Sequence, residues 1–374
     1  GFLAENGDFA EKVEACGLKL IGPSSKVINL MGNKLSARNL MEESGVPVVP
    51  GCNDVVHDED QLYRIADEIG YPVLLKASAG GGGKGMRRIY KREDLVAGWE
   101  LTRREAKASF ANDDIYIEKL IENPRHIEIQ ILADSLGNVV YLPERDCSIQ
   151  RNNQKIIEES PSRANSDLLE KMYKSAVMCA KACGYEGTGT VEFIVDKYDN
   201  YYFMEMNTRI QVEYPVTEMV TGINLIKEQI RIASGLPLSV KQEDVAANGH
   251  AIEVRVNAQN PYDNFRPSCG EISFFLPPGG LDTRFETALY QGAKILPFYD
   301  SMMAKLIVKG STRMDAIKKL RRAVSETIID GVPTNLGFIY AILYDKDFIL
   351  GNIDTNYVAH KEAELLKSMH VTGE

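Results

Sequence analysis

A run of glycines between two predicted strands is the feature that most constrains how this chain can fold. Residues 80–85 read Gly-Gly-Gly-Gly-Lys-Gly, with an apolar strand pattern at residues 72–76 and a second one at residues 86–90. Glycine has no Cβ, so the backbone N–H groups of such a loop can approach the oxygens of a phosphate group. A strand, a glycine loop and a second strand together predict a flap that folds over phosphates.

Two better-known glycine motifs fit this segment poorly. Gly80, Gly82 and Gly85 satisfy G-x-G-x-x-G, but a dinucleotide-binding fold needs a helix directly after the loop, and residues 86–90 favour a strand. A Walker A loop needs Ser or Thr after Gly-Lys, whereas Gly85 follows Lys84. A flexible linker is the remaining alternative, and the strands that directly adjoin the loop on both sides argue against it.

Polar residues on a predicted hairpin indicate a metal site. Glu205 and Asn207 are two apart in one strand, so they share a face, and the preceding strand can bring Glu192 opposite them. Carboxylate and amide oxygens among apolar neighbours suit Mg²⁺ that bridges nucleotide phosphates. The alternative is a solvated strand face, which the glycine flap upstream makes less attractive.

The same alternation continues in Arg209, Gln211 and Glu213, which we interpret as an extension of the strand. A cation, an amide and a carboxylate beside a metal site form a candidate pocket for a small anion, since Arg can bind a carbonate with two N–H groups and Glu can act as a base. A salt-bridge ladder on the surface is the alternative.

The order of elements predicts an α/β and α+β protein of two or three domains. The pattern starts with a helix near residues 9–16 and a short strand at residues 18–21, followed by one helix from about residue 24 to residue 44. From about residue 250 several strands precede a helix capped by Thr312, whose apolar stripe is expected to end at Ile328.

Composition excludes some classes of protein. The chain has 374 residues and a net charge of −10, which disfavours a general polyanion binder. No apolar run approaches the ~20 residues that span a bilayer. Six dispersed cysteines are typical of a reduced, cytoplasmic protein. The pair Cys179 and Cys183 is interpreted as core packing and not as a metal site, because no further Cys or His accompanies it.

Several long motifs resemble biotin carboxylase, a family of the ATP-grasp superfamily. They are residues 31–34 (Met-Gly-Asn-Lys), Lys76-Ala77-Ser78 with the glycine loop, residues 122–130, residues 144–151, residues 205–213 and residues 298–302. They occur in order along essentially the whole chain, and the resemblance is greatest to the biotin carboxylase subunit of acetyl-CoA carboxylase.

The resemblance implies a domain organisation. Residues 1–31 would be part of a Rossmann-like pre-ATP-grasp domain, residues 32–247 an ATP-grasp domain with a mobile lid at about 50–121, and residues 248–370 a biotin carboxylase C-terminal domain. Family members carry roughly one more half-domain before the residue numbered 1, so we expect this chain, taken alone, to have weak or no activity.

The resemblance also implies a reaction. ATP, bicarbonate and biotin on a carrier protein would give carboxybiotin, ADP and phosphate through carboxyphosphate, with Mg²⁺ or Mn²⁺. This is the first half-reaction of a biotin-dependent carboxylase, most simply acetyl-CoA carboxylase in fatty acid biosynthesis. The expected partners are the biotin carboxyl carrier protein, carboxyltransferase subunits and a second copy of the chain.

The site residues follow by matching positions. Glu213 would be the base, with Arg209, Lys155 and Arg284 catalytic and Arg284 also at biotin. Bicarbonate would contact Lys155, Arg209, Gln211, Val212 and Glu213, and the metal would contact Glu192, Glu205 and Asn207. ATP would contact Lys34, Lys76, Gly80, Gly81, Gly82, Gly83, Met86, Glu118, Lys119, Leu120, His126, Gln150 and Asn153.

Two positions depart from the family pattern. Asn153 stands where many members have His near the nucleotide, and Tyr214 follows Glu213 where His is usual. Asn can donate and accept hydrogen bonds but carries no charge. The alternatives to biotin carboxylase are another ATP-grasp ligase and a nucleotide-binding module without turnover. A protein kinase is disfavoured, because neither an H-R-D nor a D-F-G motif is present.

Overall fold

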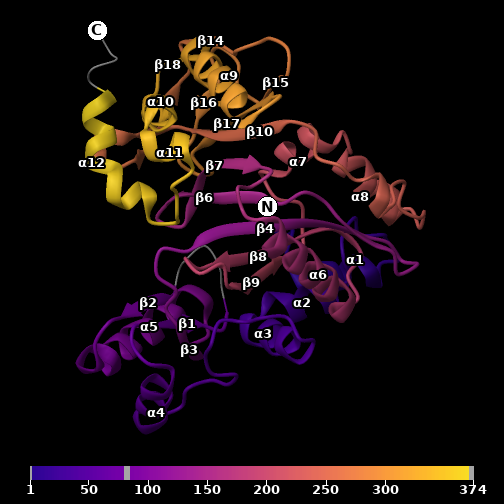
Figure 1. The fold of residues 1–374 in the computed structure, drawn as a ribbon, viewed down its shortest axis with the longest axis vertical. Coiled ribbons are helices and arrows are strands. Elements are labelled where there is room, and N and C mark those ends of the chain that lie inside the picture. Colours follow the sequence, from indigo (N-terminus) through magenta and orange to yellow (C-terminus); the bar gives the residue numbers. More distant parts are fainter. Residues whose placement is uncertain (1, 80–84, 370–374) are drawn as a thin grey trace. The chain divides into compact units, whose positions relative to one another are not determined.

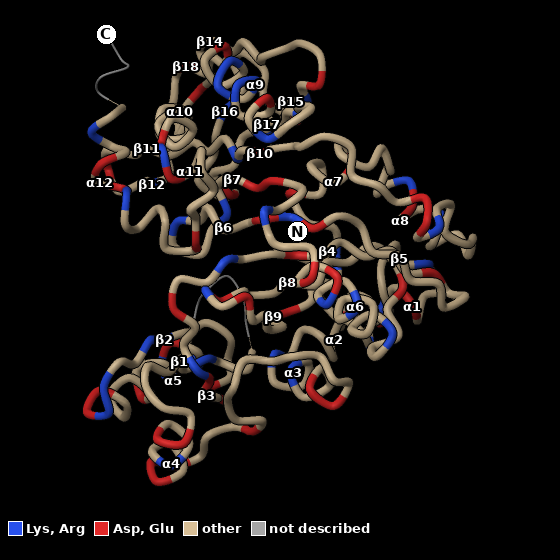
Figure 2. The backbone as a smooth tube through the Cα atoms, viewed as in Figure 1, with Lys and Arg blue, Asp and Glu red and all other residues tan. Residues whose placement is uncertain are grey.

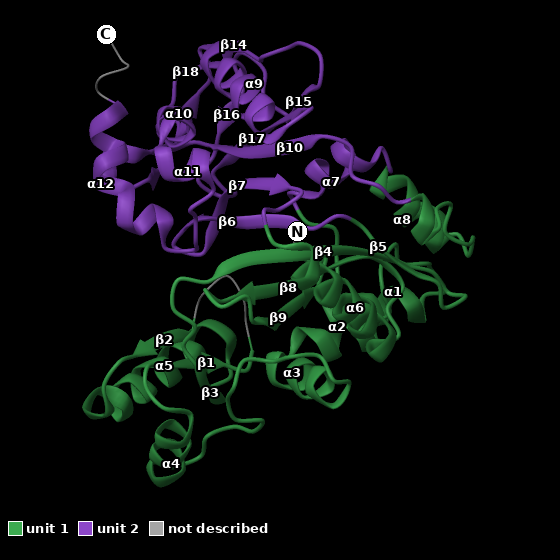
Figure 3. Cartoon of the chain, viewed as in Figure 1, with its two compact units in different colours: residues 1–142, 164–211, 224–244 green, residues 143–163, 212–223, 245–374 purple. Residues whose placement is uncertain are grey.

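The structure is a computed structural model that describes residues 2–79 and 85–369. The chain folds into two compact units, each built from separate stretches of sequence (Figure 3). Unit 1 comprises residues 1–142, 164–211 and 224–244, and unit 2 comprises residues 143–163, 212–223 and 245–374. The mixture of helices and sheets in both units confirms the predicted α/β and α+β class (Figure 1).

A small layered subdomain forms one part of unit 1. Strand β1 (Val73–Ala77) lies between the antiparallel strands β2 (Met86–Ile89) and β3 (Ile115–Lys119), and helices α4 (Glu59–Ile69) and α5 (Leu95–Phe110) pack on this sheet. Its core is apolar and includes Leu62, Val73, Leu75, Trp99 and Ile117. The subdomain therefore has a hydrophobic core of its own.

The glycine loop connects β1 to β2. Most of it, including the predicted phosphate-binding residues Gly80, Gly81, Gly82 and Gly83, lies outside the described residues. Gly85 closes the loop with a φ of +68°, and a Cβ on it would lie 3.0 Å from the Cβ of Ala77. The left-handed backbone and this close approach explain why glycine occupies the position. The two predicted flanking strands are present, and they pair with each other, with Lys76 and Met86 as register partners.

The second part of unit 1 is a larger antiparallel sheet. The strands are β4 (Arg125–Ala133), β5 (Val139–Tyr141), β8 (Gly187–Val195) and β9 (Tyr201–Asn207), in which β4 pairs with β5 and β8, and β8 pairs with β9. The helices of this part are α1 (Gly7–Ala15), α2 (Ser25–Gly32), α3 (Lys34–Glu43), α6 (Ser166–Cys183) and α8 (Leu225–Ala233). Residues of α2, α3 and α6 share one core with this sheet, and Cys179 and Cys183 belong to it, as their interpretation as packing residues requires.

Unit 2 is built on five antiparallel strands in the order β15, β17, β10, β7, β6. Their bounds are β6 (Arg145–Arg151), β7 (Gln154–Ser160), β10 (His250–Asn257), β15 (Thr283–Thr287) and β17 (Met302–Gly310). Its helices are α7 (Tyr214–Thr221), α9 (Arg313–Glu326), α10 (Leu336–Tyr344), α11 (Lys346–Leu350) and α12 (Tyr357–Met369). Short strands complete it: β11 (Gln259–Asn260), β12 (Arg266–Pro267), β13 (Gly270–Glu271), β14 (Phe274–Leu276), β16 (Lys294–Ile295) and β18 (Ile328–Asp330).

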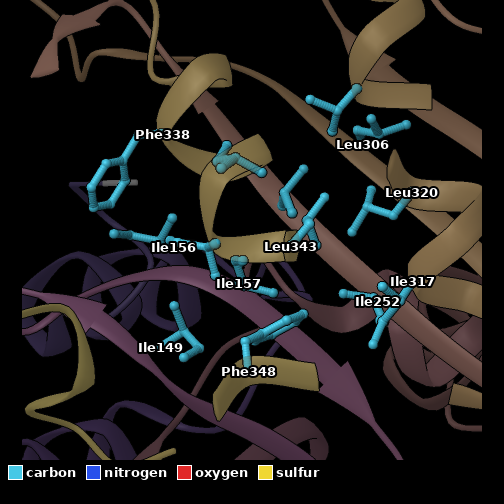
Figure 4. Packing of buried hydrophobic residues seen from close by; sticks show 14 of the residues in the cluster. Ile149, Ile156, Ile157, Ile252, Leu306, Ile317, Leu320, Phe338, Leu343 and Phe348 are labelled. Carbon is cyan, nitrogen blue, oxygen red and sulfur yellow. The ribbon is translucent and has the colours of Figure 1, made fainter. Parts of the chain in front are cut away.

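The main core of unit 2 lies on one face of these strands. Ile157 and Ile252 from the sheet meet Leu320 of α9 and Leu343 of α10, and Phe348 of α11 lies in the same cluster (Figure 4). The opposite face of β10 and β17 is covered by α7, through Val216, Val220, Ala251 and Ile307. Strand β10 is thus buried on both faces, so charged side chains that it carries on the α7 face are held in the interior.

Three details of the sequence-based prediction are wrong. Residues 18–21 form no strand, because no strand pairs with them in the described part of the chain and unpaired backbone groups give no ladder. The single helix from residue 24 to residue 44 is two helices, since Asn33 has an extended backbone and its side chain caps α3 by accepting from Ser36 N at 2.9 Å. Ile328 is outside α9 and pairs with Leu276 in a two-stranded sheet.

Other elements match the expectations or were not foreseen. Thr312 caps α9 as predicted, with its Oγ1 accepting from Asp315 N at 3.2 Å. The strand pair β6 and β7 and the helix α7 were not predicted, although they carry several of the expected site residues. Within residues 2–79 and 85–369, we find no helix with the length and apolar character needed to cross a membrane.

Replacing Phe338 by Ala is expected to destabilise unit 2. Phe338 is fully buried and meets Phe265 edge to face with ring centroids 4.8 Å apart. Removing the ring leaves a cavity that costs about 3–5 kcal/mol. Thermal unfolding of Phe338→Ala would show this loss, while Phe298→Ala, the same change at a side chain that is 80% exposed, should change the stability little. Equal effects of the two substitutions would contradict the assignment of the core.

Candidate active site

The predicted acidic hairpin of unit 1 is present. Glu192 on β8 and Glu205 on β9 are direct register partners, and Asn207 lies opposite Thr190 on the same strand pair. Glu192 and Asn207 are buried, and Glu205 is half-buried. The hairpin therefore brings two carboxylates and an amide to one small region, as the alternation of the sequence predicts.

Each carboxylate of this hairpin has a basic or polar neighbour. Glu192 accepts a hydrogen bond from Gln211 Nε2 at 2.6 Å, and its other oxygen lies 3.2 Å from His126 Nε2. Glu205 lies 3.4 Å from Lys34 Nζ, at the first turn of α3. These contacts lower the cost of burying the acids and hold both carboxylates in place.

The donor set fits a hard divalent cation. Glu192 and Glu205 offer carboxylate oxygens, the ligands that Mg²⁺ and Mn²⁺ prefer. One ligand atom from each of His126, Glu128 and Glu192 also lies within 4.8 Å of the others. Asn207 Oδ1 accepts from Arg209 Nη2 at 3.1 Å, so its oxygen is already engaged. The two opposed glutamates are therefore the stronger part of the predicted metal set.

A buried ion triad lies on the small sheet of unit 1. Glu118 on β3 accepts from Lys76 Nζ of β1 at 2.9 Å and from Arg38 Nη1 of α3 at 3.2 Å. All three side chains are at most 10% exposed. One carboxylate with two cations leaves a surplus positive charge on the strand that leads into the glycine loop, which favours an anion such as a phosphate.

The loop after β9 corrects one part of the sequence interpretation. Strand β9 ends at Asn207, so Arg209, Gln211 and Glu213 do not continue its alternation. Thr208 N donates instead to Glu5 Oε1 at 3.1 Å, and Arg209 Nε donates to Glu5 Oε2 at 2.9 Å. Directly after the strand, the backbone N–H of Thr208 thus has a side-chain acceptor in place of a neighbouring strand.

In unit 2, Glu213 is almost completely buried, with 2% of its surface exposed. It directly precedes α7. Lys155 Nζ of β7 donates to Glu213 Oε1 at 2.5 Å, and Arg255 Nη2 of β10 donates to Glu213 Oε2 at 3.0 Å. The two cations hold this carboxylate in a fixed position, where it can act as a base, and they can themselves bind an anion beside it.

Other predicted residues lie close by in unit 2. Val212 precedes Glu213 and its carbonyl accepts from Lys305 Nζ at 2.9 Å. Gln150 lies on β6, where it donates to Cys147 O at 2.7 Å. Asn153 occupies the turn between β6 and β7 with a φ of +62°, a left-handed conformation that Asn tolerates better than most residues.

Arg284 does not contact Glu213. Its guanidinium contacts Glu218 Oε2 at 2.6 Å, Glu286 and the Tyr214 hydroxyl at 3.2 Å, with the Tyr214 ring beneath it. These neighbours raise the pKa of Arg284 against the opposing effect of burial. Tyr214, the second departure from the family pattern, thus contacts Arg284 and not the candidate base.

Arg255 is a residue that the sequence analysis missed. It contacts both Glu213 and Glu158, whose Oε1 lies 2.6 Å from Arg255 Nε. The available signal was the alternation of β10, in which Glu253 and Arg255 interrupt an otherwise apolar strand. A charged pair at that spacing on a buried strand points to one polar patch.

The described site residues fall into two sets. Unit 1 holds Lys34, Lys76, Met86, Glu118, Lys119, Leu120, His126, Glu192, Glu205, Asn207, Arg209 and Gln211. Unit 2 holds Gln150, Asn153, Lys155, Val212, Glu213 and Arg284. Most residues expected at the nucleotide and all those expected at the metal thus lie in unit 1, whereas Gln150, Asn153 and the candidate base with its cations lie in unit 2.

Comparisons with known proteins show the family of the chain. The family described as "Carbamoyl-phosphate synthase L chain, ATP binding domain" matches residues 33–241, and "Biotin carboxylase C-terminal domain" matches residues 253–360. Biotin carboxylase 1 of Bacillus subtilis is 53% identical over 360 residues, which cover 96% of this chain and 80% of that protein. A pyruvate carboxylase subunit of Methanothermobacter thermautotrophicus is 50% identical over 96% of this chain and 73% of its own length.

The solved structures give the same result. The biotin carboxylase domain dimer of Hydrogenobacter thermophilus 2-oxoglutarate carboxylase, with MgADP, ADP and bicarbonate, superposes with a TM-score of 0.95 at 48% identity. That comparison covers 98% of this chain and 81% of the solved one. The ATP-grasp fold that the resemblance implied is therefore confirmed.

Replacing Glu118 by Gln tests the buried triad of unit 1. Loss of the anion would leave Lys76 and Arg38 buried without their shared counter-charge, which costs about 3–5 kcal/mol. Unfolding measurements should show this destabilisation for Glu118→Gln. The control is Glu105→Gln, which removes an exposed ion pair with Arg87 and should cost less than about 1 kcal/mol. A Glu118→Gln protein as stable as the control would contradict the triad.

Proposed function

The chain belongs to the biotin carboxylase family, and we propose that its ATP-dependent ligase activity transfers bicarbonate carbon to biotin on a carrier protein with Glu213 as the base. The observation that carries the proposal is the buried Glu213 carboxylate, which Lys155 and Arg255 hold from two sides. The two cations fix the position of the carboxylate, and a base in a fixed position beside cations can remove a proton from an anion that those cations bind.

Unit 1 supplies the nucleotide site. Lys34 and Lys76 lie beside Glu205 and Glu118, and ATP phosphates would take over part of their pairing. The edge strand segment Glu118, Lys119 and Leu120 would contact the adenosine, and Met86 and His126 would flank it. A divalent ion held by Glu192 and Glu205 would neutralise phosphate charge as the γ-phosphoryl group is transferred.

Bicarbonate is the proposed nucleophile. Lys155, Arg209, Gln211 and the Val212 backbone would bind it, and Glu213 would accept its proton. The freed oxygen attacks the γ-phosphorus, the bond to the β-phosphate oxygen breaks, and ADP leaves. The products of this step are carboxyphosphate and ADP. Side-chain cations that are already in place stabilise the charge on the transferring group without reorganisation.

Biotin is the proposed acceptor of the carboxyl group. Carboxyphosphate breaks into CO₂ and phosphate, the released phosphate takes the proton of the biotin ring nitrogen, and that nitrogen attacks CO₂. Arg209 would stabilise the biotin enolate. Arg284 was expected to position biotin, and its contacts with Glu218 and Tyr214 mean that biotin would have to displace or extend an existing ion pair.

The second half-reaction lies with a partner. We propose acetyl-CoA carboxylase as the parent enzyme, with carboxyltransferase subunits, a biotin carboxyl carrier protein and a second copy of this chain as partners in the cytoplasm. The relatives that belong to a pyruvate carboxylase and to a 2-oxoglutarate carboxylase make 2-oxo acids the alternative acceptors. We also propose that the ATP-grasp domain begins at residue 32 and ends at residue 247.

Replacing Glu213 by Gln should abolish turnover. The amide cannot accept the bicarbonate proton, so ATP hydrolysis that depends on bicarbonate and rises with free biotin should fall by about 10²–10⁴-fold. The matched control is Glu243→Gln, an exposed acid of unit 1. Bicarbonate-dependent hydrolysis that survives in Glu213→Gln would remove Glu213 from the role of base. Hydrolysis that never depends on bicarbonate in the unchanged protein would favour another ATP-grasp ligase.

Replacing Glu205 by Gln tests the metal site. With one of two opposed carboxylates neutralised, the Mg²⁺ concentration for half-maximal ATP hydrolysis should rise about 10-fold or more, because changes beside metal ligands already cost 10–100-fold in affinity. Chelation with EDTA should stop the unchanged enzyme. The exposed Glu186→Gln serves as the control. An unaltered Mg²⁺ requirement in Glu205→Gln would place the ion elsewhere.

A further inference from the structure

Two buried glutamates of unit 2 face each other across neighbouring strands. Glu158 on β7 and Glu253 on β10 are direct register partners in an antiparallel pair, so their side chains leave the sheet on the same face. That face of β10 is the one covered by α7. Figure 2 shows acidic residues along β7. Neither glutamate belongs to the set of residues proposed to contact substrates.

The pair is sealed from solvent and incompletely bonded. Glu158 and Glu253 are both 0% exposed. Glu158 Oε1 accepts from Arg255 Nε at 2.6 Å, but Glu158 Oε2 and both carboxylate oxygens of Glu253 have no hydrogen-bond partner among the described residues. Two adjacent ionised carboxylates with three unsatisfied oxygens would be very costly in the interior, whereas one shared proton provides a donor between them.

The surrounding charges lead to the same conclusion. The charged groups that act on Glu253 are Glu158 of β7, Arg255 of β10, Lys305 of β17 and Glu213 before α7, and Lys155 of β7 acts on its partner Glu158. Lys305 is neutralised by Glu286 at 2.7 Å. Three carboxylates, those of Glu158, Glu213 and Glu253, therefore share two cations, those of Lys155 and Arg255. One proton on the glutamate pair balances the cluster.

Of the two glutamates, Glu253 is the one that carries the proton. Burial, followed by the charge of Glu158, raises the pKa of Glu253 well above its ordinary value. Burial also raises the pKa of Glu158, to about 7, but the charge of Arg255 acts against the rise. The anion thus resides where Arg255 donates, on Glu158, and Glu253 is the neutral partner.

We propose that Glu158 and Glu253 share one proton at neutral pH and that this acid pair positions Arg255 on Glu213. The second half of the proposal rests on the proposed function, because it gives Arg255 the task of holding the base. With the proton in place, Arg255 divides its guanidinium between Glu158 and Glu213. Loss of the proton would add a second buried anion that competes with Glu213 for Arg255.

The first half has a signature in stability. A folded-state pKa above the unfolded value means that the native protein keeps a proton that the unfolded chain loses above about pH 4.5. The unchanged protein therefore loses stability as the pH rises from there toward the folded-state pKa of Glu253. A glutamine at residue 253 has no proton to lose and keeps an N–H donor for Glu158.

The melting temperature of Glu253→Gln, measured against the unchanged protein, should rise by about 3 °C for each pH unit within that window. Glu271→Gln is the matched control, since Glu271 is exposed on β13 and the change in charge is the same. The difference in melting temperature between Glu271→Gln and the unchanged protein should stay constant between about pH 5 and pH 8, because this range lies above the ordinary pKa of an exposed glutamate. A flat difference for Glu253→Gln as well would overturn the shared proton.

The positioning role is tested by the pH profile of bicarbonate-dependent ATP hydrolysis. In Glu253→Gln the fall of kcat at alkaline pH should move to higher pH, because the glutamine at residue 253 has no proton to lose. In Glu158→Gln, Arg255 loses its anchor, so kcat should fall about tenfold or more while the KM for ATP stays within about twofold. An alkaline limb that does not move, despite the expected melting behaviour, would overturn the positioning role alone. Absence of bicarbonate-dependent hydrolysis in a longer protein that also carries the half-domain expected before residue 1 would instead refute the proposed function, and the melting experiment would still decide the acid pair.

Discussion

The chemistry of this protein depends on keeping charge inside unit 2. Glu213 is buried, and a buried carboxylate is tolerable only with cations that also hold it in place. Lys155 reaches it from β7 and Arg255 from β10, so two adjacent strands and the start of α7 must be correctly placed together. The apolar side of the same strands, with Ile157, Ile252 and the helices on them, supplies the rigidity that this placement needs.

Unit 1 carries the residues proposed to bind the phosphates of a nucleotide and a divalent ion. The surplus positive charge at Lys76 and Arg38 and the opposed acids Glu192 and Glu205 belong to the same unit as the glycine loop. In the proposed function, the cations would attract phosphates and the acids would select a divalent ion. Neither set alone would distinguish a nucleotide with its metal from any other anion or cation.

The parts of the fold and of the candidate site that a local sequence pattern determines could be predicted from the sequence. The hairpin with Glu192 and Glu205 follows from alternation, and the strands beside the glycine loop follow from their apolar runs. Strands β6 and β7 were not predicted, because they bury polar side chains such as Arg145 and Glu159 and their sequence therefore lacks an apolar alternation. Glu159 is stabilised by the distant His250 and Arg313, which together lower its pKa to about 2 despite burial. Arg255 was missed for another reason, since its partners Glu158 and Glu213 are far away in sequence.

The central claim is that bicarbonate attacks the γ-phosphoryl group of ATP and leaves one of its oxygens on phosphorus. Bicarbonate labelled with ¹⁸O, supplied with ATP, Mg²⁺ and free biotin, tests this directly. Mass spectrometry of the released phosphate should find one ¹⁸O atom transferred from bicarbonate, because carboxyphosphate breaks at its C–O bond and the bridging oxygen stays with phosphorus. Phosphate that carries only oxygen from water would mean direct hydrolysis of ATP, and would contradict the account.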